Sequence, residues 1–282
     1  MGLGGINAST GYPEISKEDL NSILSILKKR FIEGSFPNLN ERIDRIKRLK
    51  TLVENNTDDF HKALENDFGT RHEQLSLLAD TLPVIGSANN ALKNIKKWIK
   101  PEKRKPNFPL GLLGAKAFIQ AQPYGVVGII SPWNFPLTLS LGPLVEIFAA
   151  GNNAMMKLSE FVPETSALTE KLIKEFFNDD EVVVVNGGPQ TSQSFSGLPF
   201  DHLLFTGSTS VAKKVAYEAS SNLVPLTLEL GGKSPVIIGP KAKMSKSVDK
   251  IMMGKLLNSG QICISPDYVF VPENNTVDFV NH

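Results

Sequence analysis

The sequence has little cysteine and almost no excess of either charge. Its single cysteine, Cys263, cannot form a disulfide within the chain, which fits a reducing compartment. The 30 Lys and Arg residues nearly balance the 29 Asp and Glu residues, so nothing points to nucleic acid or an anionic membrane as a partner. A composition of 41% hydrophobic and 21% charged residues excludes collagen, a coiled coil and wholesale disorder. We expect a cytoplasmic globular protein with a small-molecule partner.

We expect neither a secretory signal nor a membrane span. Residues 1–13 are rich in glycine and lack both a basic start and a long apolar run. Residues 117–145 carry no charged residue and are long enough for a span, but four prolines interrupt them. We interpret this stretch as a buried strand, a turn and the start of a helix.

The first hundred residues have the pattern of helices. In residues 41–68, apolar side chains mostly recur three or four positions apart and charged side chains occupy the other face, which predicts an amphipathic helix. Residues 75–99 continue the pattern, with Pro83 as an expected kink or break. Residues 101–109 are interpreted as a polar connector.

From Ala115 onward, short β-branched runs alternate with helical stretches, which is the pattern of βα units and a mainly parallel sheet. Strands are expected at 116–122, 125–130, 153–158, 181–186, 202–206, 226–230 and 235–238. Helices are expected at 139–150, 163–177, 210–220 and 248–258. The first of these strands has a second interpretation, as one arm of a hairpin outside the main sheet.

A buried strand at Gly125–Ile130 runs into a turn that displays Trp133 and Asn134. The amide of Asn134 is a candidate donor to an oxyanion, because its NH2 group cannot be protonated away. On local sequence alone, an asparagine that caps the turn is the more frequent role.

Two further strand ends have features that suit a nucleotide. Lys157 lies at the end of the strand expected at 153–158 and Glu160 follows it, and an acid at the carboxyl end of a strand in a doubly wound sheet can accept hydrogen bonds from ribose hydroxyls. Gly207 and Ser208 form a turn before a helix, where free N–H groups suit a phosphate. The first motif is equally typical of a solvated charged pair. The second lacks the GxGxxG pattern and also fits an ordinary capped connection.

The last two motifs offer a base and a thiol. Glu229 ends an apolar strand before two glycines, and burial there would raise its pKa toward that of a general base. An exposed loop acid is the alternative. Cys263 lies in a turn after a helical stretch, and a cysteine taken by itself is more often an inert part of the core.

Taken together and in order, these motifs resemble the aldehyde dehydrogenase superfamily from about residue 60 onward. The stretches 159–165, 200–209 and 263–269 are most similar to its bacterial coniferyl aldehyde dehydrogenase branch. The resemblance implies an α/β fold in which a Rossmann-like parallel sheet is flanked by helices, with helices before it and the start of a second α/β domain after it. The implied division is an NAD(P)-binding domain at 1–230, with a possible oligomerisation hairpin at 110–123, and the N-terminal part of a catalytic domain at 231–282.

The resemblance also implies roles for single residues. Cys263 matches the nucleophile, Asn134 the oxyanion donor and Glu229 the base that activates water. An aldehyde would form a thiohemiacetal on the thiolate, pass a hydride to the nicotinamide and leave a thioester, which water would hydrolyse to a carboxylic acid. The implied cofactor-binding residues are Trp133, Lys157, Glu160, Gly207, Ser208 and Gly231.

The resemblance implies NAD as cofactor, because Glu160 facing the ribose would repel a 2'-phosphate, although some family members with this acid also accept NADP. No metal is expected. Family members are usually much longer, so we expect a partial chain with negligible aldehyde oxidation by itself and a homodimer for the complete one. Two alternatives stay open: a dinucleotide-binding module without turnover, and a reductase or acylating enzyme of the same superfamily. Glu229 favours hydrolysis over the latter.

Overall fold

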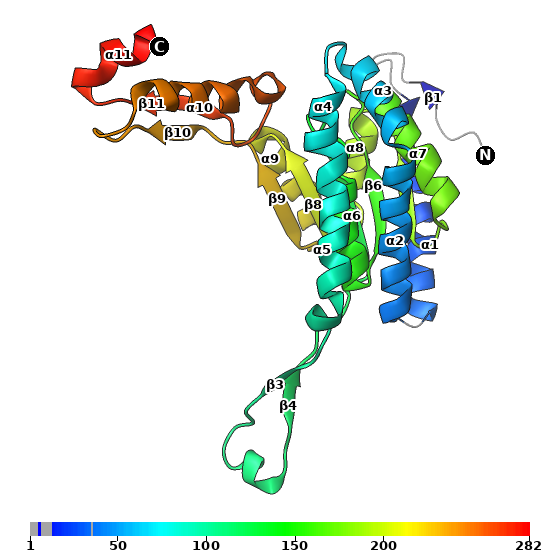
Figure 1. Ribbon diagram of the computed structural model, residues 1–282. Helices are drawn as coiled ribbons and strands as arrows, with labels where there is room; N and C mark the ends of the chain where they lie inside the picture. The colour runs from blue at the N-terminus through cyan, green and yellow to red at the C-terminus, as the bar shows by residue number, and fades with distance from the viewer. Residues whose placement is uncertain (1–4, 7–12, 35) are drawn as a thin grey trace.

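The computed structural model describes residues 5–6, 13–34 and 36–282. Its centre is a five-stranded parallel sheet with the strand order β7-β6-β5-β8-β9 (Figure 1). The strands are β5 (Val126–Ile130), β6 (Asn153–Lys157), β7 (Val182–Val185), β8 (His202–Gly207) and β9 (Leu226–Leu230). Five of the expected strands are thereby confirmed to within two residues at each end. The chain passes from β5 outward to β7 and then returns to β8 beside β5, so the strand order reverses between β5 and β8.

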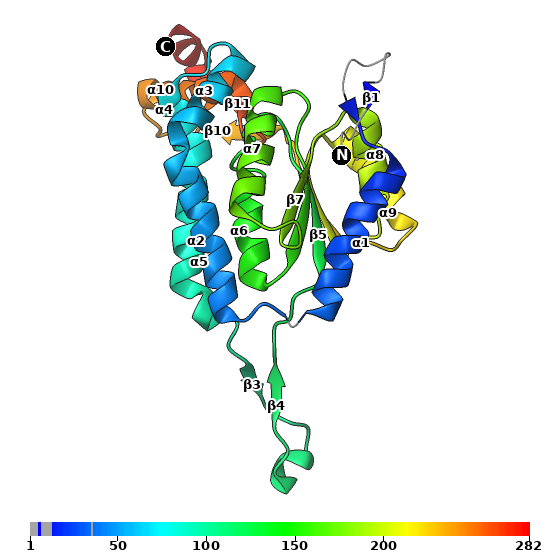
Figure 2. The ribbon, with the colours of Figure 1, turned by 90° about the vertical axis from the view of Figure 1, so that its right-hand side faces the viewer.

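Helices cover both faces of the sheet (Figure 2). Every residue of β5 and β6 is buried, as is typical of a parallel sheet enclosed on both sides. One face packs against α2 (Leu39–Asn55), α5 (Leu82–Trp98), α6 (Leu141–Ala150) and α7 (Pro163–Phe176). The other packs against α1 (Lys17–Glu33), α8 (Pro189–Ser196) and α9 (Thr209–Ser220). This arrangement confirms the α/β class.

The N-terminal helices differ from the sequence prediction at one point. Residues 41–68 are not one helix but belong to two, α2 and α3 (Thr57–Phe68), which meet at Asn56. The backbone of Asn56 has φ −120° and ψ 23°, outside the helical region, and its side-chain amide donates to the carbonyl of Leu52. An amide that satisfies the preceding turn in this way ends a helix that the apolar spacing alone would continue.

The expected break near Pro83 does not occur, because residues 73–98 are helical without interruption, with one π-helical turn just before Pro83. A short helix, α4 (Glu73–Ser76), leads into a π-helical turn, η1 (Leu77–Thr81), before α5 begins at Leu82. Pro83 therefore occupies the first turn of α5, where a missing N–H costs little.

A hairpin extends away from the body of the molecule (Figure 1). It consists of β3 (Glu102–Arg104), the short 3-10 helix η2 (Leu110–Leu113) and β4 (Ala117–Ile119), and its two strands pair antiparallel. The second interpretation of residues 116–122, a hairpin arm outside the main sheet, is therefore correct. The interpretation of residues 101–109 as a simple connector is wrong at β3, because its three exposed charged side chains gave no sign of a strand.

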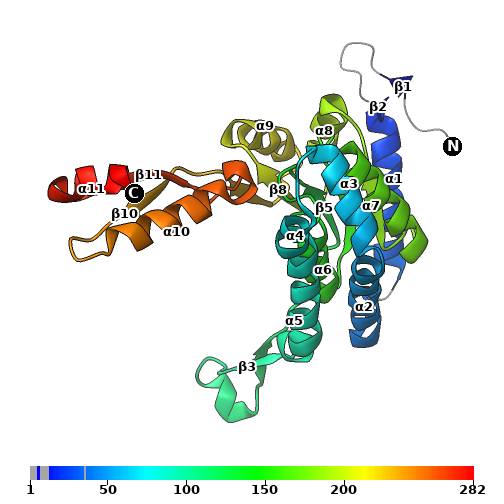
Figure 3. The same cartoon turned by 45° about the horizontal axis from the view of Figure 1, so that its top comes forward.

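The C-terminal segment lies to the side of β9 (Figure 3). It contains β10 (Ser234–Ile237) and β11 (Pro266–Phe270), which pair parallel in a sheet of their own. The expected strand at 235–238 thus belongs to this second sheet. The segment also contains α10 (Met244–Leu256), which begins four residues earlier than expected, the 3-10 turns η3 (Leu257–Gly260) and η4 (Glu273–Asn275), and α11 (Thr276–Asn281). The division between residues 230 and 231 stays a prediction.

A further short ribbon, β1 (Gly5–Ile6) with β2 (Pro13–Glu14), precedes α1. Across the ranges that the structure describes, no helix is both long and apolar enough to cross a membrane.

Candidate functional site

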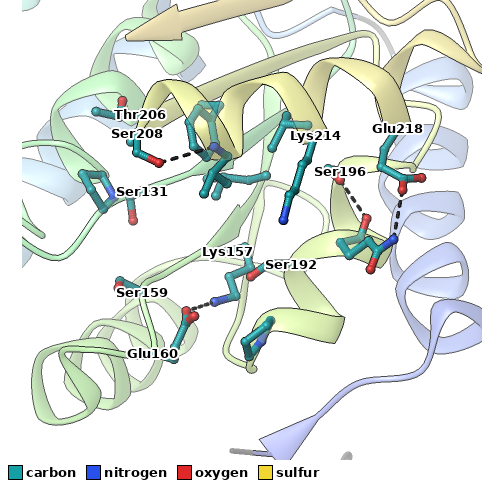
Figure 4. Close-up of a pocket in the computed structure, with 18 of the residues that line it drawn as sticks. Ser131, Lys157, Ser159, Glu160, Ser192, Ser196, Thr206, Ser208, Lys214 and Glu218 are labelled. Carbon is teal, nitrogen blue, oxygen red and sulfur yellow. Dashed lines mark hydrogen bonds and ion pairs between the residues drawn. The ribbon is translucent and has the colours of Figure 1, made fainter. Parts of the chain in front are cut away.

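A cavity of about 860 Å³ opens at the carboxyl ends of β5, β6 and β8 (Figure 4). This is the place where the strand order of the sheet reverses, and doubly wound sheets bind ligands in the crevice at such a point. Five residues predicted to contact a cofactor line it: Trp133, Lys157, Glu160, Gly207 and Ser208. The sixth, Gly231, is not among the lining residues.

Lys157 and Glu160 form an ion pair on the wall of this cavity. Lys157 is the last residue of β6 and is only 1% exposed, and its Nζ lies 2.6 Å from Glu160 Oε2. Burial lowers the pKa of Lys157, and the carboxylate of Glu160 partly opposes that change. The pair fixes one oxygen of Glu160 and leaves the rest of the carboxylate able to accept hydrogen bonds from hydroxyl groups.

The second strand end presents the start of α9. Ser208 is the N-cap of α9, and its hydroxyl accepts a hydrogen bond of 3.3 Å from the N–H of Val211. A Cβ atom on Gly207 would lie 2.5 Å from the Phe205 ring, so only glycine fits this approach. The remaining free N–H groups and the helix dipole suit an anionic group at this wall.

Sequence reasoning missed the side of the cavity that α8 provides. Pro189, Ser192 and Gln193 of α8 line it, and Lys214 of α9 points into it (Figure 4). The residues of α8 are mostly polar and show no apolar periodicity, so the helix gave no signal of that kind. A glycine followed by proline at the first helical position was the available clue.

A buried hydroxyl in the cavity has no partner within the described part of the chain. Ser131 follows β5, is 6% exposed, and its Oγ makes no hydrogen bond there. Buried polar atoms in folded proteins are nearly always satisfied, so an unpaired one on a cavity wall fits a site completed by a polar ligand. Together with the Lys157–Glu160 pair and the start of α9, this supports a dinucleotide in the cavity.

Asn134 lies next to the segment that carries the thiol. Its Nδ2 donates a hydrogen bond of 2.9 Å to the carbonyl of Gln261, two residues before Cys263. The two residues are 127 positions apart in sequence, so this contact is made by the fold. Cys263 itself is exposed, and the alternative of an inert core cysteine is wrong.

The turn before Cys263 has an unusual backbone. Asn258, Ser259 and Gly260 have φ values of 47°, 55° and 77°, all in the left-handed region. Residues other than glycine adopt this conformation at an energetic cost, and such strain is concentrated at functional sites. The turn reverses the chain directly after α10 and leaves the thiol accessible.

Glu229 is exposed, which corrects the expectation that apolar surroundings enclose it. It is the fourth residue of β9, whose three central residues are all exposed, because β9 is the edge strand of the sheet. The glycines that follow it do bring the chain close to the thiol segment: a Cβ atom on Gly232 would lie 3.5 Å from the carbonyl oxygen of Cys263.

The fold therefore brings the segments of Asn134, Glu229 and Cys263 together beside the cavity. Cys263 presents an accessible thiol, and the Asn134 amide has one N–H that does not bond to Gln261. The carboxylate of Glu229 lies on β9. Within the described ranges, no three His, Cys, Asp or Glu side chains are grouped so that they could hold a metal ion.

Comparison with known proteins gives consistent matches. The model of the aldehyde dehydrogenase family matches residues 7–282. The chain is 48% identical over 265 residues to a probable coniferyl aldehyde dehydrogenase of Caulobacter vibrioides and 44% identical over 280 residues to a coniferyl aldehyde dehydrogenase of a Pseudomonas species. These matches cover 94% and 99% of this chain but 55% and 56% of the relatives, so the chain spans about half their length.

Solved structures agree with this. The substrate-bound state of Staphylococcus aureus AldH superposes with a TM-score of 0.87 at 34% identity, covering 92% of this chain and 56% of that one. The NAD+ complex of an aldehyde dehydrogenase from Bacillus cereus gives a TM-score of 0.85 at 25% identity and covers 99% and 57%.

Proposed function

Because this chain belongs to the aldehyde dehydrogenase family, we propose that it carries the nucleophile and the cofactor groove for NAD-dependent oxidation of an aldehyde to a carboxylic acid. The main support is the hydrogen bond from Asn134 Nδ2 to the carbonyl of Gln261, which brings a fixed amide donor to the turn that presents Cys263. The cofactor groove is the cavity between Trp133, Glu160 and Ser208. Lys157, Glu160 and Ser208 would hold NAD there, and the cofactor would supply the hydride acceptor.

Cys263 is the nucleophile. Its exposed thiol loses a proton to solvent water, and the thiolate sulfur bonds to the carbonyl carbon of the aldehyde. The carbonyl oxygen becomes an oxyanion, which accepts hydrogen bonds from the second N–H of the Asn134 amide and from the backbone N–H of Cys263. Departure of hydride from the same carbon leaves a thioester on Cys263.

Glu229 completes the cycle as a general base. It removes a proton from a water molecule, whose oxygen attacks the thioester carbon, and the Cys263 sulfur leaves. The proton on Glu229 then passes to the departing thiolate, so the products are a carboxylic acid, a regenerated thiol and a regenerated base. Exposure of Glu229 on the edge strand gives water free access to this carboxylate.

The proposed substrate class is aromatic aldehydes, and the proposed cofactor is NAD. The first rests on the similarity to relatives named for coniferyl aldehyde, and the second on Glu160 at the wall of the groove. A carboxylate at that place repels the 2'-phosphate of NADP.

The test is NADH formation by the complete recombinant protein that contains these 282 residues, with coniferyl aldehyde, benzaldehyde and hexanal. We expect NADH with the aromatic aldehydes and none in Cys263→Ser, whose fold is checked by circular dichroism. NADH formation that survives Cys263→Ser would refute the proposal. Binding of NAD without NADH from any aldehyde would instead support a dinucleotide-binding module without turnover.

A further inference from the structure

A buried ion pair lies beneath the turn that carries Asn134. Arg71 is 4% exposed and Asp80 is 0% exposed, and Arg71 Nη2 donates a hydrogen bond of 2.5 Å to Asp80 Oδ2. Neither residue lines the cavity, and the proposed reaction uses neither of them. Burying two charges is costly, and an apolar pair of similar volume often stabilises a fold as well or better.

The pair holds both ends of the turn at once. Arg71 Nη1 donates a hydrogen bond of 2.8 Å to the carbonyl oxygen of Asn134. Asp80 Oδ1 accepts hydrogen bonds of 3.0 Å and 3.1 Å from the N–H groups of Leu137 and Thr138. One ion pair thus fixes a five-residue turn from its first residue to its last.

Two further contacts fix the position of the guanidinium and the turn. The Arg71 guanidinium lies 4.8 Å from the Phe68 ring centroid and 5.2 Å from that of Phe135, close enough for cation–π attraction. The carbonyl of Asn134 also accepts a hydrogen bond of 3.2 Å from Asn258 Nδ2, in the left-handed turn before Cys263. The carbonyl of Asn134 is therefore held from both sides, while its side chain reaches Gln261.

We propose that Arg71 and Asp80 are positioning residues, which hold the Asn134 amide in place toward the Cys263 turn. Asn134 carries its donor on a short side chain, so a rotation of its backbone would move the amide away from Gln261. The charged hydrogen bond from Arg71 prevents that rotation. This proposal deepens the proposed function and rests on it for its catalytic meaning, but the placement of Asn134 is measurable without turnover.

The test uses NMR of the chain with 15N-labelled asparagine. The side-chain amide of Asn134 is identified by its absence in Asn134→Ala. In the wild type we expect a hydrogen-bonded, slowly exchanging amide. In Arg71→Met we expect its signals to move to the positions of a free amide and its exchange with solvent to accelerate about tenfold, the effect of losing one hydrogen bond. Arg71→Lys, which keeps the charge, should recover part of the protection.

The matched control is Arg48→Met. Arg48 also forms an ion pair and donates to a backbone carbonyl, but its partners are Glu181 and Phe176. We expect this variant to lower the melting temperature and to leave the Asn134 amide unchanged.

The proposal is overturned if the Asn134 amide keeps its wild-type chemical shift and exchange rate in Arg71→Met while the melting temperature falls. The ion pair would then have a purely structural role. If Arg71→Met does not fold, Asp80→Asn, which keeps the shape of the side chain, is tested in its place. The chemical shift and exchange rate of the Asn134 amide and the melting temperature are then compared in the same way. Failure of the proposed function gives a different result, NADH formation that persists in Cys263→Ser.

Discussion

Glu160 Oε2 is held 2.6 Å from Lys157 Nζ, and the lysine that holds it is almost fully buried at the end of β6. Because Lys157 ends a rigid strand, the Glu160 carboxylate that is paired with it has little freedom to turn away from a phosphate that enters the cavity. The pair therefore determines the charge that a cofactor meets at this wall of the cavity.

We predict that Glu160→Gln narrows the preference for NAD over NADP. Removing the carboxylate abolishes its repulsion of a 2'-phosphate and frees the Lys157 ammonium to attract it. We expect the ratio of the NADP and NAD dissociation constants to fall about tenfold, which corresponds to about 1.4 kcal/mol. The measurement is a titration of Trp133 fluorescence in a Trp98→Phe background.

The control for this prediction is Glu175→Gln, which removes an exposed carboxylate of α7 that does not line the cavity. It should leave both dissociation constants unchanged. An unaltered ratio in Glu160→Gln would show that another group discriminates between the cofactors.

We predict that Glu229→Gln separates the two halves of the reaction. Hydride transfer does not need this carboxylate, whereas hydrolysis of the thioester does. One equivalent of NADH should form rapidly, and steady turnover should fall by about 10²–10⁴-fold, the usual contribution of a general base. Mass spectrometry should find the acyl group on Cys263.

Asp249→Asn, at an exposed position of α10, is the matched control and should turn over normally. Steady turnover of Glu229→Gln at the wild-type rate would exclude Glu229 as the base.

We predict a characteristic pH dependence of folding stability from Asp80. Burial raises its pKa to about 6, although Arg71 and the N–H groups of Leu137 and Thr138 oppose the change. The folded state therefore binds more protons than the unfolded state between about pH 4 and pH 6. Over this range the contribution of Asp80 to the free energy of unfolding decreases as pH rises, by up to about 3 kcal/mol.

The measurement is urea denaturation of wild type and Asp80→Asn at a series of pH values. His61, which contacts the neighbouring Thr81, has a pKa lowered by burial, so its contribution increases as pH rises. It is present in both proteins and cancels in their difference. A difference that does not change between pH 4 and pH 6 would contradict the prediction.

We predict that the β3–β4 hairpin mediates self-association. Phe108, Leu112 and Leu113 near its tip are 86%, 79% and 80% exposed, an apolar surface that the described residues do not cover. The double substitution Leu112→Asp with Leu113→Asp should convert a dimer to a monomer without changing the melting temperature. Light scattering after gel filtration measures the mass.

Ile32→Asp is the control, since Ile32 is as exposed on α1 but lies outside the hairpin. A monomeric wild type, or a double variant that stays dimeric, would refute the role of the hairpin.

The sequence allowed the sheet and five of the residues that line the cavity to be predicted. Residues of β5 and β6 form short apolar runs because both faces of the sheet are covered, and the polar residues that follow such runs lie at one edge by the geometry of parallel strands. This is why the position of Lys157, Glu160 and Ser208 at one edge of the sheet could be predicted from the sequence.

Other features depend on contacts that no local pattern contains. Arg71, in the connection between α3 and α4, and Asp80, in a helical stretch, are of residue types that are usually exposed. Only the packing of the Asn134 turn against them makes them buried. The exposure of Glu229 follows from the place of β9 at the edge of the sheet, and strand order cannot be read from the spacing of apolar residues.

The lining of the cavity ends at Glu218, whereas Cys263 belongs to a segment that begins after β9. The residues that line the cavity and the segment that carries the sulfur thus come from separate stretches of the chain. The hydrogen bonds between Asn134 and the turn before Cys263 join these two stretches, so a change in one alters the geometry of the other.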